Sequence, residues 1–289
     1  MGIYKKLYSF VSCQSLIAAM LISSFIVGPV TGGELEQPVS YKLLQTSDWS
    51  NITSGSEPSE RAFFKLTYDS QNNNIILFGG YPYNSETWVY DYANNTWSNR
   101  TTSTGPSARH SFALSFVETV GVTVLFGGYD GTNVVDDTWT YYTQKNFWTQ
   151  QIVDNRPSPR YGHAMAYDRQ SDKLILFGGN NSTNSLADTW SYDLNNPSRS
   201  WVPITVTQAP SPRWGHAMAY DTQSDIIILF GGSDGAAYFN DTWSYDYNTN
   251  TWAMMKPVTA PSARYGHAMA YDSRSDRIIL FGGFDGTKL

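Results

Sequence analysis

Histidine and arginine recur in this chain at fixed spacing, and both residue types could form a binding site. His163, His216 and His267 each stand three residues after an arginine. Imidazole is a common metal ligand in proteins, so these side chains could hold a metal ion. The matching positions of two earlier repeats hold Phe64 and Phe112, and phenylalanine cannot bind a metal. We therefore expect the histidines to fill space in a core, and we predict neither a metal site nor a cofactor.

Five arginines each stand 18 residues before a Gly-Gly pair. Guanidinium groups bind carboxylates and phosphates, so the five could line an anion site. Alternatively, each could fix its repeat to a neighbour through a main-chain hydrogen bond or an ion pair. The acidic residue of the recurring ETW or DTW segment is a candidate partner, and recurrence in every repeat favours this structural role. The arginines are Arg61, Arg109, Arg160, Arg213 and Arg264.

The glycine pairs and the tryptophans define a long repeat. Successive pairs are separated by 48, 51, 53 and 51 residues, and a tryptophan stands 12 residues before every arginine. The glycines end apolar runs and no helical pattern follows, so we expect backbone turns rather than a phosphate-binding loop. We expect the tryptophans to lie in the core. The pairs are Gly79–Gly80, Gly127–Gly128, Gly178–Gly179, Gly231–Gly232 and Gly282–Gly283, and the tryptophans are Trp88, Trp97, Trp139, Trp148, Trp190, Trp201, Trp243 and Trp252.

Each repeat reads as four strands, which we name A to D in chain order. In the third repeat, A is residues 161–168, B is 173–179, C is 188–193 and D contains Trp201. Strand A alternates large and small residues, so its small face should pack under the large residues of the next repeat. Four antiparallel strands with two buried faces, repeated at this period, predict radial blades rather than a sandwich.

The Gly-Gly pair after an apolar strand, followed by two tryptophans, resembles the kelch repeat. The resemblance covers residues 41–289 and implies an all-β, kelch-type β-propeller. We expect four complete four-stranded blades and a partial fifth, and hence a C-terminally truncated chain. The blades should begin near residues 61, 109, 160, 213 and 264, with an additional strand D in residues 41–53.

The N-terminus has a different composition. Lys5 and Lys6 precede an apolar stretch, Leu16 to Val30, which ends in small residues. This order is typical of an export signal, although an uncleaved anchor is the alternative. We predict a signal over residues 1–32 and a linker over residues 33–40. The mature protein would then be secreted or lie on the cell surface, without stable membrane insertion, and Cys13, the sole cysteine, would be lost with the signal.

Composition limits the partners. The formal net charge is −6 and lysine and arginine do not cluster beyond the extreme N-terminus, so a nucleic-acid ligand is not expected. Asn-x-Ser/Thr triplets predict a glycoprotein if the chain is exported, although turns rich in asparagine and threonine also produce them by chance. These triplets begin at Asn51, Asn94, Asn99, Asn180, Asn181 and Asn240.

No arrangement of catalytic residues stands out, and we predict none. Kelch-fold enzymes that resemble galactose oxidase use a copper site with a Cys–Tyr crosslink, which a chain without a mature cysteine cannot form. We expect a binding or adhesion module for protein or carbohydrate. The alternatives are an extracellular carbohydrate-active enzyme and a purely structural surface repeat.

We expect ligand binding through the B–C loops, where the repeats differ, and through the D–A linkers. In an up-and-down blade these loops share a face with the D–A linkers. Exposed aromatic rings beside carboxylates suit the recognition of sugars or peptides. Alternatively, the residues have only structural roles, in which Asp-Gly forms the turns and the rings pack on the blade. The predicted binding residues are Tyr81, Tyr83, Tyr129, Asp130, Asp234, Tyr238, Phe239, Phe284 and Asp285.

Overall fold

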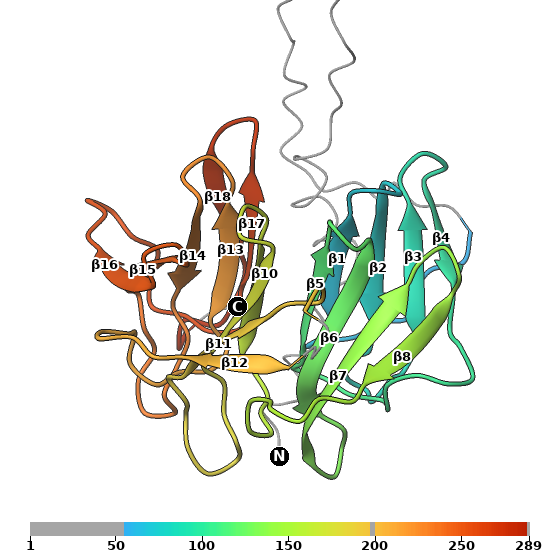
Figure 1. Ribbon diagram of the computed structural model, residues 1–289, viewed down its shortest axis with the longest axis horizontal. Helices are drawn as coiled ribbons and strands as arrows, with labels where there is room; N and C mark the ends of the chain where they lie inside the picture. Colours follow the sequence, from blue (N-terminus) through green and yellow to red (C-terminus); the bar gives the residue numbers. More distant parts are fainter. Residues whose placement is uncertain (1–54, 197–199, 288–289) are drawn as a thin grey trace, which may run out of the picture.

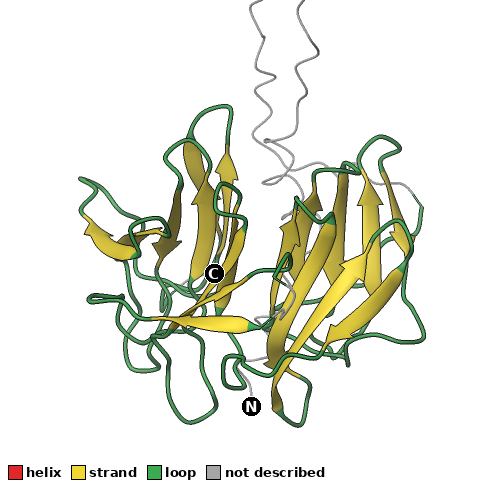
Figure 2. Cartoon of the chain, viewed as in Figure 1, coloured by secondary structure: helices red, strands yellow, loops and turns green. Residues whose placement is uncertain are grey.

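The computed structural model describes residues 55–196 and 200–287. In this part of the chain all regular structure is β: four antiparallel sheets of four strands and a fifth sheet of two (Figures 1 and 2). The prediction of a β-propeller with four complete blades and a partial fifth is confirmed.

Each complete blade contains four strands in chain order. Blade 1 has β1 (Lys65–Asp69), β2 (Asn74–Phe78), β3 (Thr87–Asp91) and β4 (Thr96–Asn99). Blade 2 has β5 (Ala113–Val117), β6 (Val122–Tyr129), β7 (Val134–Tyr142) and β8 (Phe147–Gln151). Blade 3 has β9 (Ala164–Asp168), β10 (Lys173–Phe177), β11 (Thr189–Tyr192) and β12 (Trp201–Ile204). Blade 4 has β13 (Ala217–Asp221), β14 (Ile226–Phe230), β15 (Thr242–Asp246) and β16 (Thr251–Met255), and the half-blade has β17 (Ala268–Asp272) and β18 (Arg277–Phe281).

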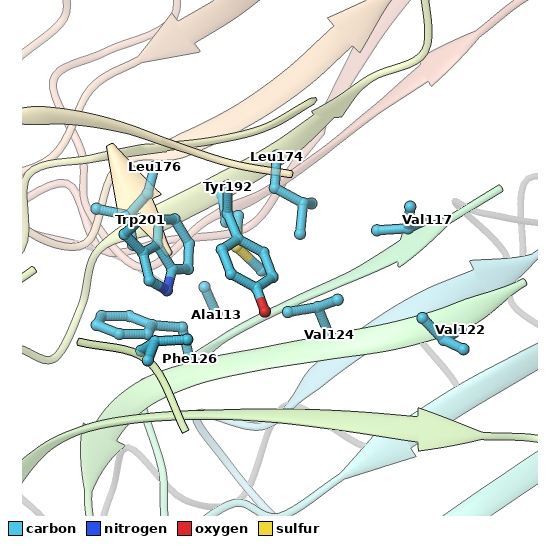
Figure 3. Packing of buried hydrophobic residues seen from close by; sticks show 11 residues of the cluster. Ala113, Val117, Val122, Val124, Phe126, Leu174, Leu176, Tyr192 and Trp201 are labelled. Carbon is cyan, nitrogen blue, oxygen red and sulfur yellow. The ribbon is translucent and has the colours of Figure 1, made fainter. Parts of the chain in front are cut away.

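The first strands of successive blades, β1, β5, β9, β13 and β17, pack next to one another, which makes strand A the inner strand. Large and small residues alternate along strand A, so its large residues face one neighbouring blade and its small residues face the other. Met165 packs toward blade 2, in a core with Phe126 and Trp201 that Figure 3 shows. Ala164 and Ala166, on the other face, pack with the larger residues of blade 4. Small residues of one blade thus accommodate large residues of the next, as the sequence predicts.

A side-chain hydrogen bond joins the outer parts of neighbouring blades. The indole Nε1 of Trp148 donates to the Thr87 hydroxyl of the preceding blade at 2.9 Å. Trp201 and Trp252 bond Thr138 and Thr189 in the same way, at 3.0 and 3.1 Å. The threonine of the DTW or ETW segment therefore satisfies the polar atom of a large buried ring, which would otherwise carry a desolvation cost.

Each arginine makes contacts in two directions, as Arg160 illustrates. Its guanidinium donates to both oxygens of Asp188, at 2.6 and 2.8 Å, and to the Gly178 carbonyl at 3.0 Å, all within blade 3. Its main-chain carbonyl accepts a 2.8 Å hydrogen bond from the N–H of Gly128 in blade 2. The ion pair with the acidic residue of the DTW segment was anticipated. However, it lies within one blade, and the main chain makes the contact between blades.

The arginines of the other blades make similar contacts. Arg61, Arg109 and Arg213 pair with Glu86, Asp137 and Asp241, at 2.6, 2.5 and 2.6 Å. Glycine N–H groups of blades 1, 3 and 4 bond the carbonyls of the next arginines along the chain. The guanidinium of Arg264 bonds the Gly282 carbonyl and Ser262, and has no carboxylate partner among the described residues. Four of the five arginines therefore fix the fold instead of lining an anion site.

The half-blade differs from the complete blades in burial. The sequence AMAYD forms β9, β13 and β17, yet its first four residues are only partly buried in β17, while the first three are buried in the other two strands.

Tyr41 to Ser50, in which we expect a further strand, lies outside the described residues, as does the expected signal. In the described ranges no helix is long and apolar enough to cross a membrane.

The second glycine of each pair lies against the residues just before strand A of its own blade. Gly179 has a φ of +102°, and a β-carbon there would lie 2.9 Å from the His163 β-carbon. Gly235 has a nearly equal φ of +99°, but a β-carbon there would meet nothing within 4 Å. Backbone strain is therefore similar at the two positions. We expect Gly179→Ala to lower the free energy of unfolding by about 2 kcal/mol more than Gly235→Ala, measured by urea denaturation. Equal losses would show that Gly179 does not approach His163 of its own blade this closely.

Candidate binding surface

A chain of main-chain hydrogen bonds links successive blades just before strand A. The N–H of Ser111 donates to the Phe63 carbonyl at 3.0 Å. Gly162, Gly215 and Gly266 continue the series, each donating to the preceding member at 2.7 Å. All five residues have positive φ, between 54° and 71°. We call this series the belt. The left-handed conformation is costly for Phe63 and Ser111, which are not glycines.

The residue before each belt residue joins the D–A linker to the B–C loop of its own blade. It forms an isolated antiparallel bridge with the residue that follows the Gly-Gly pair. These bridges place the linkers and the B–C loops on one face of the propeller. The bridged pairs are Ala62 with Tyr81, His110 with Tyr129, Tyr161 with Asn180, Trp214 with Ser233, and Tyr265 with Phe284.

Aromatic rings gather on this face at the boundary between blades 1 and 2. The ring of Tyr83 stacks on His110, with centroids 5.4 Å apart and planes 30° apart. Tyr129 lies 6.2 Å from Tyr83 and 5.6 Å from His110. Tyr81 packs edge-on against Tyr83, and Phe63 lies 5.7 Å from His110. Tyr83 and Phe63 remain 42% and 50% exposed, so the cluster presents apolar area to solvent.

A second group of rings lies at the boundary between blade 4 and the half-blade. Tyr238 stacks on Tyr265, with centroids 5.3 Å apart and planes 27° apart, and Phe284 lies 6.0 Å from both. Trp214 packs 5.1 Å from Tyr265, and Tyr161 lies 6.3 Å from Trp214. We call the two groups together the aromatic surface, which consists of Phe63, Tyr81, Tyr83, His110, Tyr129, Tyr161, Trp214, Tyr238, Tyr265 and Phe284.

The structure brings together five of the predicted binding residues, in two groups. Tyr81, Tyr83 and Tyr129 lie in the first, and Tyr238 and Phe284 in the second. The rings between them come from the D–A linkers, which the prediction placed on the same face without naming any of their residues. The sequence does contain a pattern that could have identified these linker residues. The position after each arginine changes from Ala to His, Tyr, Trp and Tyr, while the positions around it vary less.

The other predicted residues have structural partners. One carboxylate oxygen of Asp130 accepts two N–H groups of its own turn, at 2.8 and 2.7 Å, and Asp234 does the same at 2.8 Å. Asp285 accepts the N–H of Thr287 at 2.9 Å. The ring of Phe239 lies 4.3 Å from the Arg213 guanidinium. The aspartates therefore shape the loops, and Phe239 packs behind the surface, where a cation–π contact supports the buried arginine.

The three repeated histidines lie between blades. Nε2 of His163 lies 3.1 Å from the Phe126 carbonyl of blade 2, and its ring packs edge-on against Phe126. His216 and His267 pack on Phe177 and Phe230 in the same way. The described residues contain no group of three or more His, Cys, Asp or Glu side chains placed to hold a metal ion. This packing accounts for phenylalanine at the matching positions.

Comparison with known proteins agrees with this architecture. Residues 26–156 and 150–289 match the KLHDC2/KLHL20/DRC7 kelch-repeats domain. This chain belongs to the kelch-repeat family. It is 30% identical over 167 residues to an F-box/kelch-repeat protein of Arabidopsis thaliana, which covers 53% of this chain and 34% of that protein. It is 43% identical over 94 residues to Tip elongation aberrant protein 1 of Schizosaccharomyces pombe, covering 31% of this chain and 8% of the relative.

The kelch resemblance inferred from the glycine and tryptophan spacing is thus confirmed. The chain spans about a third or less of the length of these relatives. What it shares with them is therefore the kelch-repeat region, and the functions of the whole proteins do not transfer directly.

The buried histidines should make stability depend on pH. Burial lowers the pKa of His267 to about 4, with the positive charges of Lys65 and Arg264 acting in the same direction. In the unfolded chain this pKa returns to about 6.5. The unfolded state then binds more protons below pH 6.5, so the free energy of unfolding falls as pH decreases through this window. Between pH 6.5 and about pH 5 we expect His267 to contribute a loss of about 1.5 kcal/mol.

Phenylalanine occupies this position in blades 1 and 2, so His267→Phe is the variant that tests the effect. We expect urea denaturation at the two pH values to show a smaller pH dependence for His267→Phe, by about the same 1.5 kcal/mol. His110→Phe, at a ring on the surface, serves as the control and should change the dependence much less. An unchanged dependence in His267→Phe would mean that this histidine is not held neutral in the fold.

Proposed function

We propose that this chain is a protein-binding module and that the aromatic surface is its binding face. Kelch-repeat propellers generally bind proteins. The observation that supports this face is that large rings remain exposed there, at positions where the repeats differ. Tyr83 and Tyr238 are 42% and 39% exposed, although both lie within aromatic clusters. Clustered aromatic side chains provide much of the binding energy in protein interfaces.

The A–B loops on the opposite face differ little between repeats, and this difference from the aromatic face supports the proposal. These loops repeat the same residues, and their polar groups bond one another. The hydroxyls of Tyr167, Tyr220 and Tyr271 donate to Asp172, Asp225 and Asp276, at 2.6, 2.6 and 2.9 Å. The same bond in three units indicates a role in holding the loop, so variation that could select a ligand is concentrated on the aromatic face.

Two further features belong to the proposal. Stacked tyrosines would also suit a sugar ring, so a glycan ligand is an alternative occupant of the same face.

The basic and apolar order of residues 1–32 supports export, with some Asn-x-Ser/Thr triplets carrying glycans in that case. Asn94, Asn99 and Asn240 are exposed in the fold and are the acceptors we propose first.

Binders selected without knowledge of the natural partner can test the face. The full chain would be screened against a random peptide display library and a glycan array. Each selected ligand would then be measured by calorimetry against Tyr83→Ala, Trp214→Ala and Tyr238→Ala. We expect at least one of these variants to weaken binding of most selected peptides about tenfold or more, with unchanged melting.

The controls are tyrosine and phenylalanine positions elsewhere on the propeller. Tyr68 is 36% exposed and Phe147 is 37% exposed, and neither contributes to the aromatic surface. Tyr68→Ala and Phe147→Ala should leave binding unchanged. Binding that depends on these controls instead would place the binding site elsewhere, and selection of glycans alone would replace a protein ligand with a carbohydrate one.

A further inference from the structure

The aromatic surface contains the same three-ring unit twice. In both copies a B–C loop tyrosine stacks on the ring that follows the next arginine, and a third ring follows that repeat's Gly-Gly pair. The first unit is Tyr83, His110 and Tyr129, and the second is Tyr238, Tyr265 and Phe284. The stacked pairs have nearly equal geometry, with centroids 5.4 and 5.3 Å apart and planes 30° and 27° apart.

A glycine supports the outer tyrosine in each unit. A β-carbon on Gly131 would lie 3.3 Å from ring atoms of Tyr83, and one on Gly286 would lie 3.2 Å from a ring atom of Tyr238. Both glycines belong to Asp-Gly-Thr turns that begin directly after the third ring. The tyrosine of one blade therefore lies against the turn of the next, and each unit spans a blade boundary in the same way.

Carboxylates outnumber cations in the B–C loops. The first four B–C loops, at residues 81–86, 129–137, 180–188 and 233–241, contain carboxylates but no lysine or arginine, and the fifth, at residues 284–289, contains Asp285 and Lys288. Asp130 follows the ring of Tyr129, and Asp285 follows that of Phe284. Hydrogen bonds from Asn133 and Thr132 lower the pKa of Asp130, so its carboxylate remains ionised at neutral pH. Arg109, beside the first unit, is buried and paired with Asp137. Arg264, directly before Tyr265 of the second unit, bonds Ser262 and the Gly282 carbonyl and has no carboxylate partner among the described residues.

We propose that each three-ring unit, together with the aspartate beside it, binds one arginine or lysine side chain, and that the partner carries two such side chains on one segment. The electron-rich faces of the rings attract a cation, and the carboxylate adds a charge-assisted hydrogen bond. Two equivalent units on one rigid face allow the second side chain to bind at a high effective concentration once the first has bound. This inference rests on the aromatic surface being the binding face, and it specifies the partner's chemistry.

Synthetic peptides provide the probe. A series carries two arginines joined by Gly-Ser linkers of increasing length, with one-arginine, two-leucine and two-glutamate peptides as comparisons. Binding to the full chain would be measured by fluorescence anisotropy at low and physiological salt. We expect one range of linker lengths to bind about tenfold or more tighter than the one-arginine peptide, and increasing salt to weaken this binding.

Variants separate the two units. Tyr83→Ala or Tyr238→Ala should each reduce the affinity of the two-arginine peptide to that of the one-arginine peptide. The double variant should lose binding of both peptides. Asp130→Asn keeps the size of the side chain, and it should weaken binding and reduce its salt dependence. Tyr68→Ala is the matched control, and thermal melting confirms that each variant folds.

The outcomes distinguish this inference from the proposed function. Equal binding of the two-leucine peptide, still sensitive to Tyr83→Ala and Tyr238→Ala, would retain the binding face and overturn the cationic ligand. Binding that does not depend on linker length would overturn the bivalent arrangement. Peptide binding that is unaffected by both tyrosine variants would overturn the binding face as well.

Discussion

The contact on which this propeller depends is made by one arginine in each of blades 2, 3 and 4. The side chain holds the carboxylate and the glycine carbonyl of its own blade, while the main-chain carbonyl accepts the glycine N–H of the blade before it. A buried ion pair by itself is weak evidence for stability, because desolvation offsets much of the attraction. Here its role is geometric. It fixes the main chain just before strand A, and the belt and the aromatic rings are attached at that point.

This constraint explains how the loops can vary without loss of the fold. The arginine, the glycine pair and the Trp–Thr bond all act on positions that recur, and together they fix the spacing of the blades. The residue directly after the arginine adjoins the belt, so its side chain is placed on the face whatever its type. Ala62, His110 and Trp214 can therefore occupy matching positions. A rigid scaffold that presents variable side chains is well suited to binding.

Much of the fold could be predicted from the sequence, because the residues that determine it repeat. The glycine spacing gave the number of blades, and the alternation in strand A indicated which face meets the next blade. The role of threonine in the DTW segment was missed, since a hydroxyl gives no sign of a partner in another blade. The ion pair of the arginine was anticipated. That its side chain bonds its own blade while its main-chain carbonyl bonds the preceding blade could be seen only in the three-dimensional structure.

The aromatic surface could be predicted only in part, for a physical reason. Tyr83 lies four residues after the first glycine of its pair, whereas Tyr238 lies seven residues after its own. No alignment of the loops relates them, because loop conformation and not spacing brings each one onto the next blade's turn. The rings between them come from the D–A linkers, so each cluster combines segments that are separate in sequence. The choice of the B–C loops was based on their variability, which indicates where selection can act but not which side chains meet.

Amide hydrogen exchange in an Arg160→Met variant tests most directly whether the arginine side chain in one blade holds the blade before it. The Gly128 N–H bonds the Arg160 carbonyl, and the Gly232 N–H makes the same bond to Arg264 at the same 2.8 Å distance. The account predicts that exchange at Gly128 becomes at least about tenfold faster while Gly232 changes much less, since the loss is local. Equal acceleration at both glycines, or none at Gly128, would contradict it.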